Sequence, residues 1–140
     1  MIRPFAVMMH RPPLAKAAAE LGAVVRFEST FGDHDRELAI VTTAFERGCD
    51  FEWQSHEPLA RAAGVSDATL REIRDGAVIT SPDDARIVEF VRELCSSGTV
   101  STSRFRAIRD ERGESGVVEL TTIVGYYTML ALVMRACEAC

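Results

Sequence analysis

The chain has 140 residues, of which 47% are hydrophobic, and a formal net charge of −5. This length suits one domain with its own hydrophobic core, because roughly two thirds of the unfolded surface is buried at this size. We therefore expect a single domain over residues 1–140. Arginines and carboxylates are interspersed along the chain and form no basic blocks, which argues against nucleic acid as a partner.

The cysteines and the apolar segments exclude further classes. The four cysteines show neither the paired spacing of a zinc site nor the density of a secreted disulfide scaffold, so we expect reduced thiols in a cytoplasmic protein. They are Cys49, Cys95, Cys137 and Cys140. The first residues hold an apolar run too short for a signal peptide. Residues 116–136 are apolar, but Glu119 and two pairs of polar residues interrupt them, which favours a helix buried in protein over a membrane span.

Apolar residues at helical spacing predict the first helices. Two prolines open a helix from Pro12, and apolar residues then recur at three- and four-residue steps as far as Phe27. A second helix is expected over about 33–47, with acidic residues at its positive end. A third is expected over about 50–63. Pro58 lies inside this third helix and removes an amide donor, which predicts a kink.

Capping residues predict the later helices. Serines at the N-cap position open a short helix over 66–74 and another that runs from 81 to Leu94 or Cys95. A further helix spans about 101–111, and the glycines at 113 and 116 open the last and most hydrophobic helix. The best strand candidate, residues 76–80, is short and lies between two capped helices. The sequence therefore predicts an all-α fold of about seven helices.

The segment from Arg36 to His56 carries the chemically most capable side chains. At about 100° per residue, four of them fall within an arc of roughly 100° on one helix face; these are Cys49, Glu52, Trp53 and His56. Glu37 lies twelve residues before Cys49 on the preceding helix. A break between the two helices allows them to fold back on each other, so we expect the five side chains to share one small pocket.

Each of these residues also has a purely structural interpretation. A single histidine on a helix is usually a surface residue, but Glu37 and Glu52 can hold the tautomer of His56 and make it an acid and base near neutral pH. The apolar neighbours of Glu52 favour its partial burial, which raises a carboxyl pKa as a general acid requires. Cys49 is either a small core residue or a nucleophile. Trp53 is either a pocket wall or part of the core.

Two tyrosines in the last helix extend the candidate site. Tyr126 and Tyr127 follow Gly125, where a buried phenol needs a hydrogen-bond partner and a glycine allows close approach of another helix. One interpretation is that a tyrosine faces the site and binds substrate. The other is that both tyrosines pack in the core or against another subunit.

The pattern resembles the carboxymuconolactone decarboxylase and alkylhydroperoxidase (AhpD-like) family of small all-helical proteins. The hydroperoxidase branch carries Glu, eleven residues, Cys, two residues, Cys, three residues and His, which corresponds here to Glu37, Cys49, Glu52 and His56. Glu52 stands where the second redox cysteine of that branch would be, so its disulfide chemistry is not transferred. The sequence is instead similar to the branch that reads C-x-x-E-W-x-x-H-E-P.

The resemblance implies a function as well as a fold. The family's namesake reaction removes carbon dioxide from a lactone acid and protonates the resulting carbon, which requires an acid and base but no metal or organic cofactor. His56 would be this group, with Glu37 and Glu52 orienting it. An arginine such as Arg36 or Arg61 would bind a substrate carboxylate. The resemblance therefore implies a lyase for a small carboxylated substrate that assembles as a homo-oligomer, commonly a trimer or hexamer.

Two alternatives remain from the sequence. One is a peroxidase-like thiol enzyme that uses Cys49 with His56, and it would need an outside thiol, or Cys137 and Cys140, for regeneration. The other is a ligand-binding member without turnover. The assembly itself has a sequence argument, because apolar residues surround most of the helix over 117–134 and predict burial between subunits.

Overall fold

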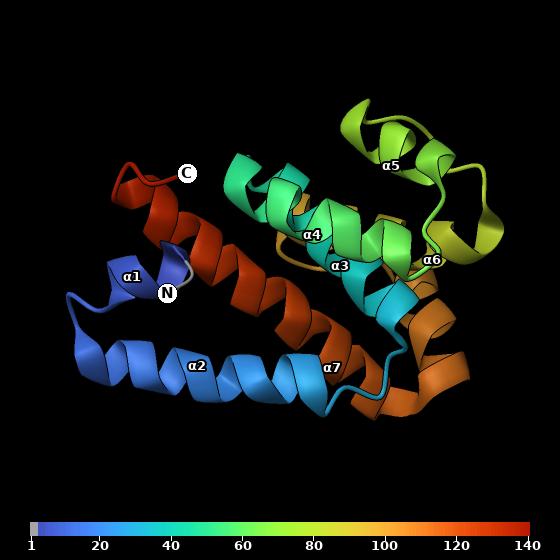
Figure 1. Ribbon diagram of the computed structural model, residues 1–140. Coiled ribbons are helices and arrows are strands. Elements are labelled where there is room, and N and C mark those ends of the chain that lie inside the picture. Colours follow the sequence, from blue (N-terminus) through green and yellow to red (C-terminus); the bar gives the residue numbers. More distant parts are fainter. Residues whose placement is uncertain (1–2) are drawn as a thin grey trace.

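The computed structural model describes residues 3–140, which form seven α-helices and no strand (Figure 1). The predicted all-α class is therefore confirmed. The helices are α1 (Arg3–Met8), α2 (Pro12–Phe27), α3 (Asp33–Glu46), α4 (Asp50–Ala62), α5 (Asp67–Arg74), α6 (Pro82–Ser97) and α7 (Thr102–Ala136).

The helix starts follow the capping residues that the sequence shows. The Ser66 hydroxyl accepts a hydrogen bond from the Thr69 amide at 3.1 Å, and the Ser81 hydroxyl accepts one from the Asp84 amide at 3.4 Å. These bonds satisfy amides that have no partner within the first turn of a helix. Residues 76–80 form no strand; they are an irregular connection between α5 and α6.

One helix was not predicted, and one predicted break takes a particular form. The short helix α1 was not expected, because six residues are too few to show a helical period. The two helices expected on either side of Gly113 form one long element, α7, that is interrupted at this residue. Gly113 has φ 72° and ψ 179°, a conformation that residues with a Cβ rarely adopt. The predicted break between two helices is therefore present at Gly113, and α7 consists of two helical segments that meet there.

Helix α3 lies at the centre of the fold. It packs against α4, α6 and α7, and four consecutive residues from Leu38 to Val41 are fully buried. On the other side, α7 also packs against α1 and α2, so that α7 lies between these two helices and α3 (Figure 1). Because α3 is covered by helices on several sides, its polar residue Glu37 is also buried.

The apolar helix α7 is only partly enclosed. Leu120, Ile123 and Leu130 are buried, whereas Val118 and Leu132 are 66% and 54% exposed. Glu119 accepts a hydrogen bond from the Thr30 amide at 2.8 Å, which fixes the loop before α3 to α7. Among residues 3–140, α7 alone is long and apolar enough to cross a membrane by length and composition, a test that the core helix of a globular protein also passes.

Candidate active site

A pocket of about 180 Å³ lies between the first two helices and the pair α4 and α7. Helix α4 contributes two polar residues, Glu52 and His56, and α7 contributes Tyr126 and Tyr127. Arg26 from the last turn of α2 adds a positive charge to a lining that is otherwise mostly apolar. The remaining lining residues are Pro4, Phe5, Ala19, Gly22, Ala23, Phe27 and Leu130.

His56 is held between two carboxylates. Its Nδ1 lies 2.8 Å from Glu37 Oε2, a hydrogen bond between α4 and α3. Its Nε2 lies 3.6 Å from Glu52 Oε2, one turn earlier on α4. All three side chains are buried. With Glu37 accepting the Nδ1 proton, the Nε2 of a neutral imidazole carries a lone pair that faces Glu52. The three side chains are therefore in contact, but only Glu52 and His56 line the pocket, whereas Glu37 contacts Nδ1 of His56 and is not among the lining residues.

Glu52 has the environment of a general acid. Burial raises the pKa of this carboxyl, and the positive charges of His56 and Arg26 oppose that rise only in part. Within the described residues, Glu52 Oε1 is a buried oxygen without a hydrogen-bond partner. A buried oxygen that the protein does not satisfy is a position at which a bound molecule can donate a hydrogen bond.

Both tyrosines line the pocket. Their rings are perpendicular with centroids 5.2 Å apart, and the ring of Tyr127 meets that of His56 in the same edge-on manner at 5.2 Å. The Tyr126 hydroxyl donates to the Ala18 carbonyl at 3.0 Å, so this buried phenol has the partner that it requires. Burial raises the pKa of each tyrosine, which keeps both phenols protonated near neutral pH.

Sequence reasoning placed the close approach of helices at the wrong glycine. A Cβ at Gly125 would meet nothing within 4 Å, whereas a Cβ at Gly22 would lie 2.3 Å from the Tyr126 hydroxyl oxygen. The absence of a side chain at Gly22 therefore allows α2 to approach α7. Gly22 was not singled out from the sequence, because a glycine inside a helical pattern carries no signal of what packs against it.

Cys49 and Trp53 do not share this pocket, so the prediction of one site for five side chains is wrong. Both line a separate cavity of about 130 Å³ together with Arg74. Cys49 is the N-cap of α4 and has non-helical dihedral angles, so a helical projection does not apply to it. It also lies seven residues before His56, which is about 10 Å along the axis of a helix.

The side chain of Trp53 has its own partners away from the pocket. Its indole N–H donates to Glu57 Oε2 at 3.0 Å, and the Arg74 guanidinium lies over its ring at 5.0 Å. Consecutive helical residues differ in direction by about 100°, which is enough to send Trp53 toward α5 while Glu52 faces α7. Trp53 is therefore part of the core between α3, α4 and α5 and not a wall of the candidate site.

The expectation of reduced thiols is wrong for two of the four cysteines. Cys49 and Cys140 form a disulfide with a Cα–Cα distance of 5.5 Å. Cys95 and Cys137 are free. The pairing joins positions 91 residues apart, and no spacing rule connects cysteines at such a separation, because connectivity depends on the fold.

The arginine of the pocket also differs from the expected ones. Arg36 pairs with Asp33 at 3.0 Å, and Arg61 pairs with Glu57 at 3.0 Å; neither lines the pocket. Within the described residues, Arg26 forms no ion pair, so its charge is available to a ligand. No pattern in the sequence singles out Arg26, since a basic residue in the last turn of a helix is a common complement to the helix dipole.

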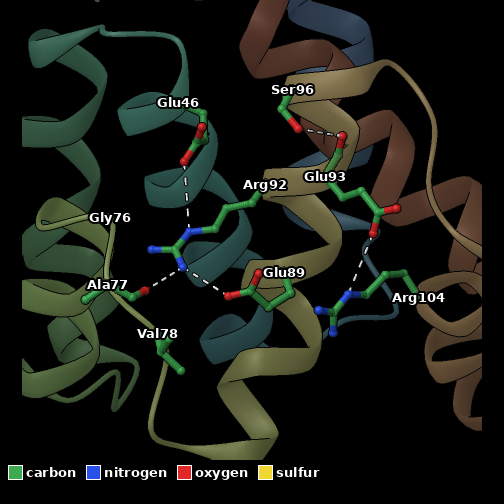
Figure 2. Close-up of a pocket in the computed structure, with 9 residues that line it drawn as sticks. All are labelled: Glu46, Gly76, Ala77, Val78, Glu89, Arg92, Glu93, Ser96 and Arg104. Carbon is green, nitrogen blue, oxygen red and sulfur yellow. Dashed lines mark hydrogen bonds and ion pairs between the residues drawn. The ribbon is translucent and has the colours of Figure 1, made fainter.

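A larger cavity of about 570 Å³ lies elsewhere, beside α6 (Figure 2). Its central cation, Arg92, lies 3.0 Å from Glu89 and donates to the Ala77 carbonyl at 2.7 Å. Arg104 lies 3.7 Å from Glu93. The arginines of this cavity are thus paired with its own glutamates. Its nine lining residues include neither histidine nor cysteine. The pocket at His56 is the better candidate for chemistry.

The fold and the pocket together define a small all-helical protein with a buried glutamate–histidine–glutamate cluster. The model of the carboxymuconolactone decarboxylase family matches residues 12–89, and the chain belongs to this family. The match covers more than half of the chain and includes Arg26, Glu37, Glu52 and His56, whereas α7 with its two tyrosines lies outside it. No curated protein gives a significant match. In residues 3–140, no group of three or more histidine, cysteine or acidic side chains is placed to hold a metal ion.

Proposed function

We propose that this chain is an acid–base enzyme that decarboxylates, or transfers a proton on, a small carboxylated substrate. The observation that supports this most directly is the Glu37–His56–Glu52 cluster at one pocket with the unpaired cation Arg26. The pocket volume of about 180 Å³ is below the roughly 300–1,000 Å³ of sites for drug-sized ligands, so we expect a substrate of metabolite size.

In this proposal, Arg26 binds a carboxylate of the substrate. A guanidinium recognises a carboxylate with two parallel hydrogen bonds, and the partly apolar lining strengthens this attraction by excluding water. The carboxylate bound by Arg26 stays on the substrate. A second carboxylate, or an acidic C–H bond, is then directed toward the opposite wall, where α4 presents Glu52 and His56.

The proton chemistry follows from the two carboxylates. When a substrate carboxylate leaves as carbon dioxide, the electron pair of the broken bond passes into the adjacent carbonyl and gives an enolate. In this proposal, the proton that completes the reaction comes from the carboxyl of Glu52, whose pKa is raised by burial, or from Nε2 of a protonated His56. Glu37 holds His56 through Nδ1 and fixes which nitrogen exchanges the proton. The cycle closes when water returns a proton to the cluster.

The proposal is tested with His56→Ala and Glu37→Gln, assayed for carbon dioxide release from a panel of small lactone carboxylic acids. General acid–base groups contribute about 10²–10⁴-fold, so we expect a loss of this size in His56→Ala with helix content unchanged. His34→Ala is the matched control, because His34 pairs with Asp84 at 3.4 Å and does not line the pocket. Full activity in His56→Ala would exclude the proposed mechanism.

A second measurement tests the site without a substrate. Long-range ¹⁵N–¹H NMR distinguishes the two neutral tautomers of histidine, and the chain has only three histidines. The hydrogen bond to Glu37 predicts the Nδ1–H tautomer for His56 and a change of that signal in Glu37→Gln. An Nε2–H tautomer in the wild-type protein would contradict the assignment of His56 Nε2 as the base.

A further inference from the structure

A disulfide joins the start of α4 to the end of the chain, away from the pocket of His56, and a third cysteine lies close to it in the sequence. Cys49 and Cys140 form a disulfide, and the exposed free thiol of Cys137 lies three residues before Cys140. Cys49 packs with Ala131 and Met134 in a cluster separate from the main core. The cysteines therefore form a site with its own surroundings, to which the acid–base chemistry proposed above assigns no role.

A tight turn after α7 directs Cys140 toward Cys49. The Ala139 amide donates to the Met134 carbonyl at 2.7 Å and the Glu138 amide donates to the Arg135 carbonyl at 3.1 Å. These two bonds form a Schellman motif, which normally has glycine at the left-handed position. Here that position is Glu138 with φ 53°, and no other non-glycine residue among residues 3–140 has positive φ. The chain thus retains a strained turn whose result is to bring Cys140 to Cys49.

Contacts from two directions hold this turn in place. Arg3 Nη1 donates to the Ala139 carbonyl at 3.2 Å. Arg135 Nη1 donates to the Arg47 carbonyl at 2.7 Å, just before the start of α4. Strained backbone conformations persist where the surrounding structure imposes them, and they concentrate at sites with a function.

The two sulfurs of the disulfide are not equivalent. Cys49 is 1% exposed, whereas Cys140 is exposed and lines a cavity of about 340 Å³ with Gly48, Arg135 and Glu138. An incoming thiol therefore reaches Cys140 and not Cys49. Cys49 is the N-cap of α4, a helix of 13 residues, and the positive end of a helix stabilises a thiolate. Attack on Cys140 therefore makes Cys49 the leaving group.

We propose that Cys49, Cys137 and Cys140 form a thiol–disulfide exchange site, at which an external monothiol rearranges the disulfide without net reduction and an external dithiol reduces it. The external thiolate attacks the sulfur of Cys140, forms a mixed disulfide with it, and breaks the bond to Cys49, which leaves as a thiolate. Cys137 then attacks Cys140, forms a Cys137–Cys140 disulfide and returns the external thiol. With a dithiol, the second thiol of the same molecule resolves the mixed disulfide instead. Two electrons then reduce Cys49 and Cys140 to thiols, and the dithiol becomes a disulfide.

The test uses the full chain isolated without reductant and exposed to about 0.1 mM reduced glutathione. After an acid quench and alkylation, peptide mass spectrometry identifies every disulfide and adduct. In the wild type we expect loss of the Cys49–Cys140 bond, a new Cys137–Cys140 bond and alkylated Cys49. In Cys137→Ser we expect the glutathione adduct on Cys140 to accumulate about tenfold, because a thiol on a short linker has an effective concentration of order millimolar.

Cys95→Ser is the matched control. Cys95 is a free cysteine whose pKa is raised by burial, and its replacement leaves the three exchanging cysteines intact. It should therefore exchange as the wild type does. An adduct on Cys49, an equal adduct in the wild type and Cys137→Ser, or the absence of a Cys49–Cys140 bond from the isolated protein would each overturn the proposal. Circular dichroism confirms that each variant is folded, and none of these outcomes depends on decarboxylase activity.

Discussion

Gly22→Ala perturbs the wall of the candidate pocket with a single methyl group. The added Cβ would lie 2.3 Å from the Tyr126 hydroxyl oxygen and 2.9 Å from its Cζ, well inside the 3.5–4.0 Å at which non-bonded carbon atoms attract each other. Either the phenol turns away or α2 moves outward. In both cases the hydrogen bond from Tyr126 to the Ala18 carbonyl is lost or weakened.

The expected change in the free energy of unfolding combines two destabilising contributions and one stabilising contribution. Overpacking a well-packed site costs about 1–3 kcal/mol, and loss of a buried hydrogen bond costs about 1 kcal/mol more. Alanine is favoured over glycine inside a helix by about 1 kcal/mol, which offsets part of this cost. We therefore expect Gly22→Ala to lower the free energy of unfolding by about 1–3 kcal/mol, and to reduce turnover because the displaced phenol lines the pocket.

The assay is urea unfolding followed by the fluorescence of Trp53, the single tryptophan of the chain, at one fixed protein concentration. Gly125→Ala is the control, since a Cβ there meets nothing within 4 Å; it should raise stability by about 0.5–1 kcal/mol. Adding Tyr126→Phe to Gly22→Ala removes the nearest atom and should recover part of the loss. Equal stabilisation by Gly22→Ala and Gly125→Ala would refute the packing of α2 on Tyr126.

Two further predictions concern charge and assembly. Folded Glu52 keeps its proton to higher pH than unfolded Glu52, so its contribution to stability is lost as pH rises from about 4.3 through its raised pKa. Glu52→Gln should therefore gain stability relative to the wild type over this rise, as measured by urea unfolding at several pH values; a constant difference would contradict the raised pKa. For assembly, Leu14, Val24 and Phe27 of α2 are 58%, 48% and 78% exposed, as large apolar side chains at a subunit contact would be in a separated chain. Light scattering at micromolar concentration should give several times 15.4 kDa; a soluble monomer would exclude the homo-oligomer.

The helices could be predicted because their signals are local. Prolines open α2 and α6, and serines at the N-cap start α5 and α6, so the expected and observed starts agree within a residue or two. The end of α6 was placed too early. Its apolar spacing fades near Cys95, but the helix continues to Ser97 and ends where Gly98 adopts φ 75°. A glycine that adopts a left-handed conformation is the more reliable signal for the end of this helix.

The candidate site was predictable where helical spacing and the family pattern agreed. The spacing of Glu37 and His56 belongs to that pattern, and the two side chains meet at 2.8 Å across two helices. Cys49 was misplaced because helical projection was extended to an N-cap residue outside the helix. Arg26 and Gly22 gave no signal, since their roles depend on how α2 docks on α7. That docking is set by side-chain packing that no period in the sequence describes.

The two proposals place two kinds of chemistry at different ends of α4. Glu52 Oε2 lies 3.6 Å from His56 Nε2, and a carboxyl at this position cannot form a disulfide. Cys49 lies at the N-terminal end of α4, away from His56, and forms a disulfide with Cys140. If both proposals hold, Cys49→Ser leaves the Nδ1–H tautomer of His56 intact, and His56→Ala leaves the disulfide intact. The two sites are then independent, although α4 carries both.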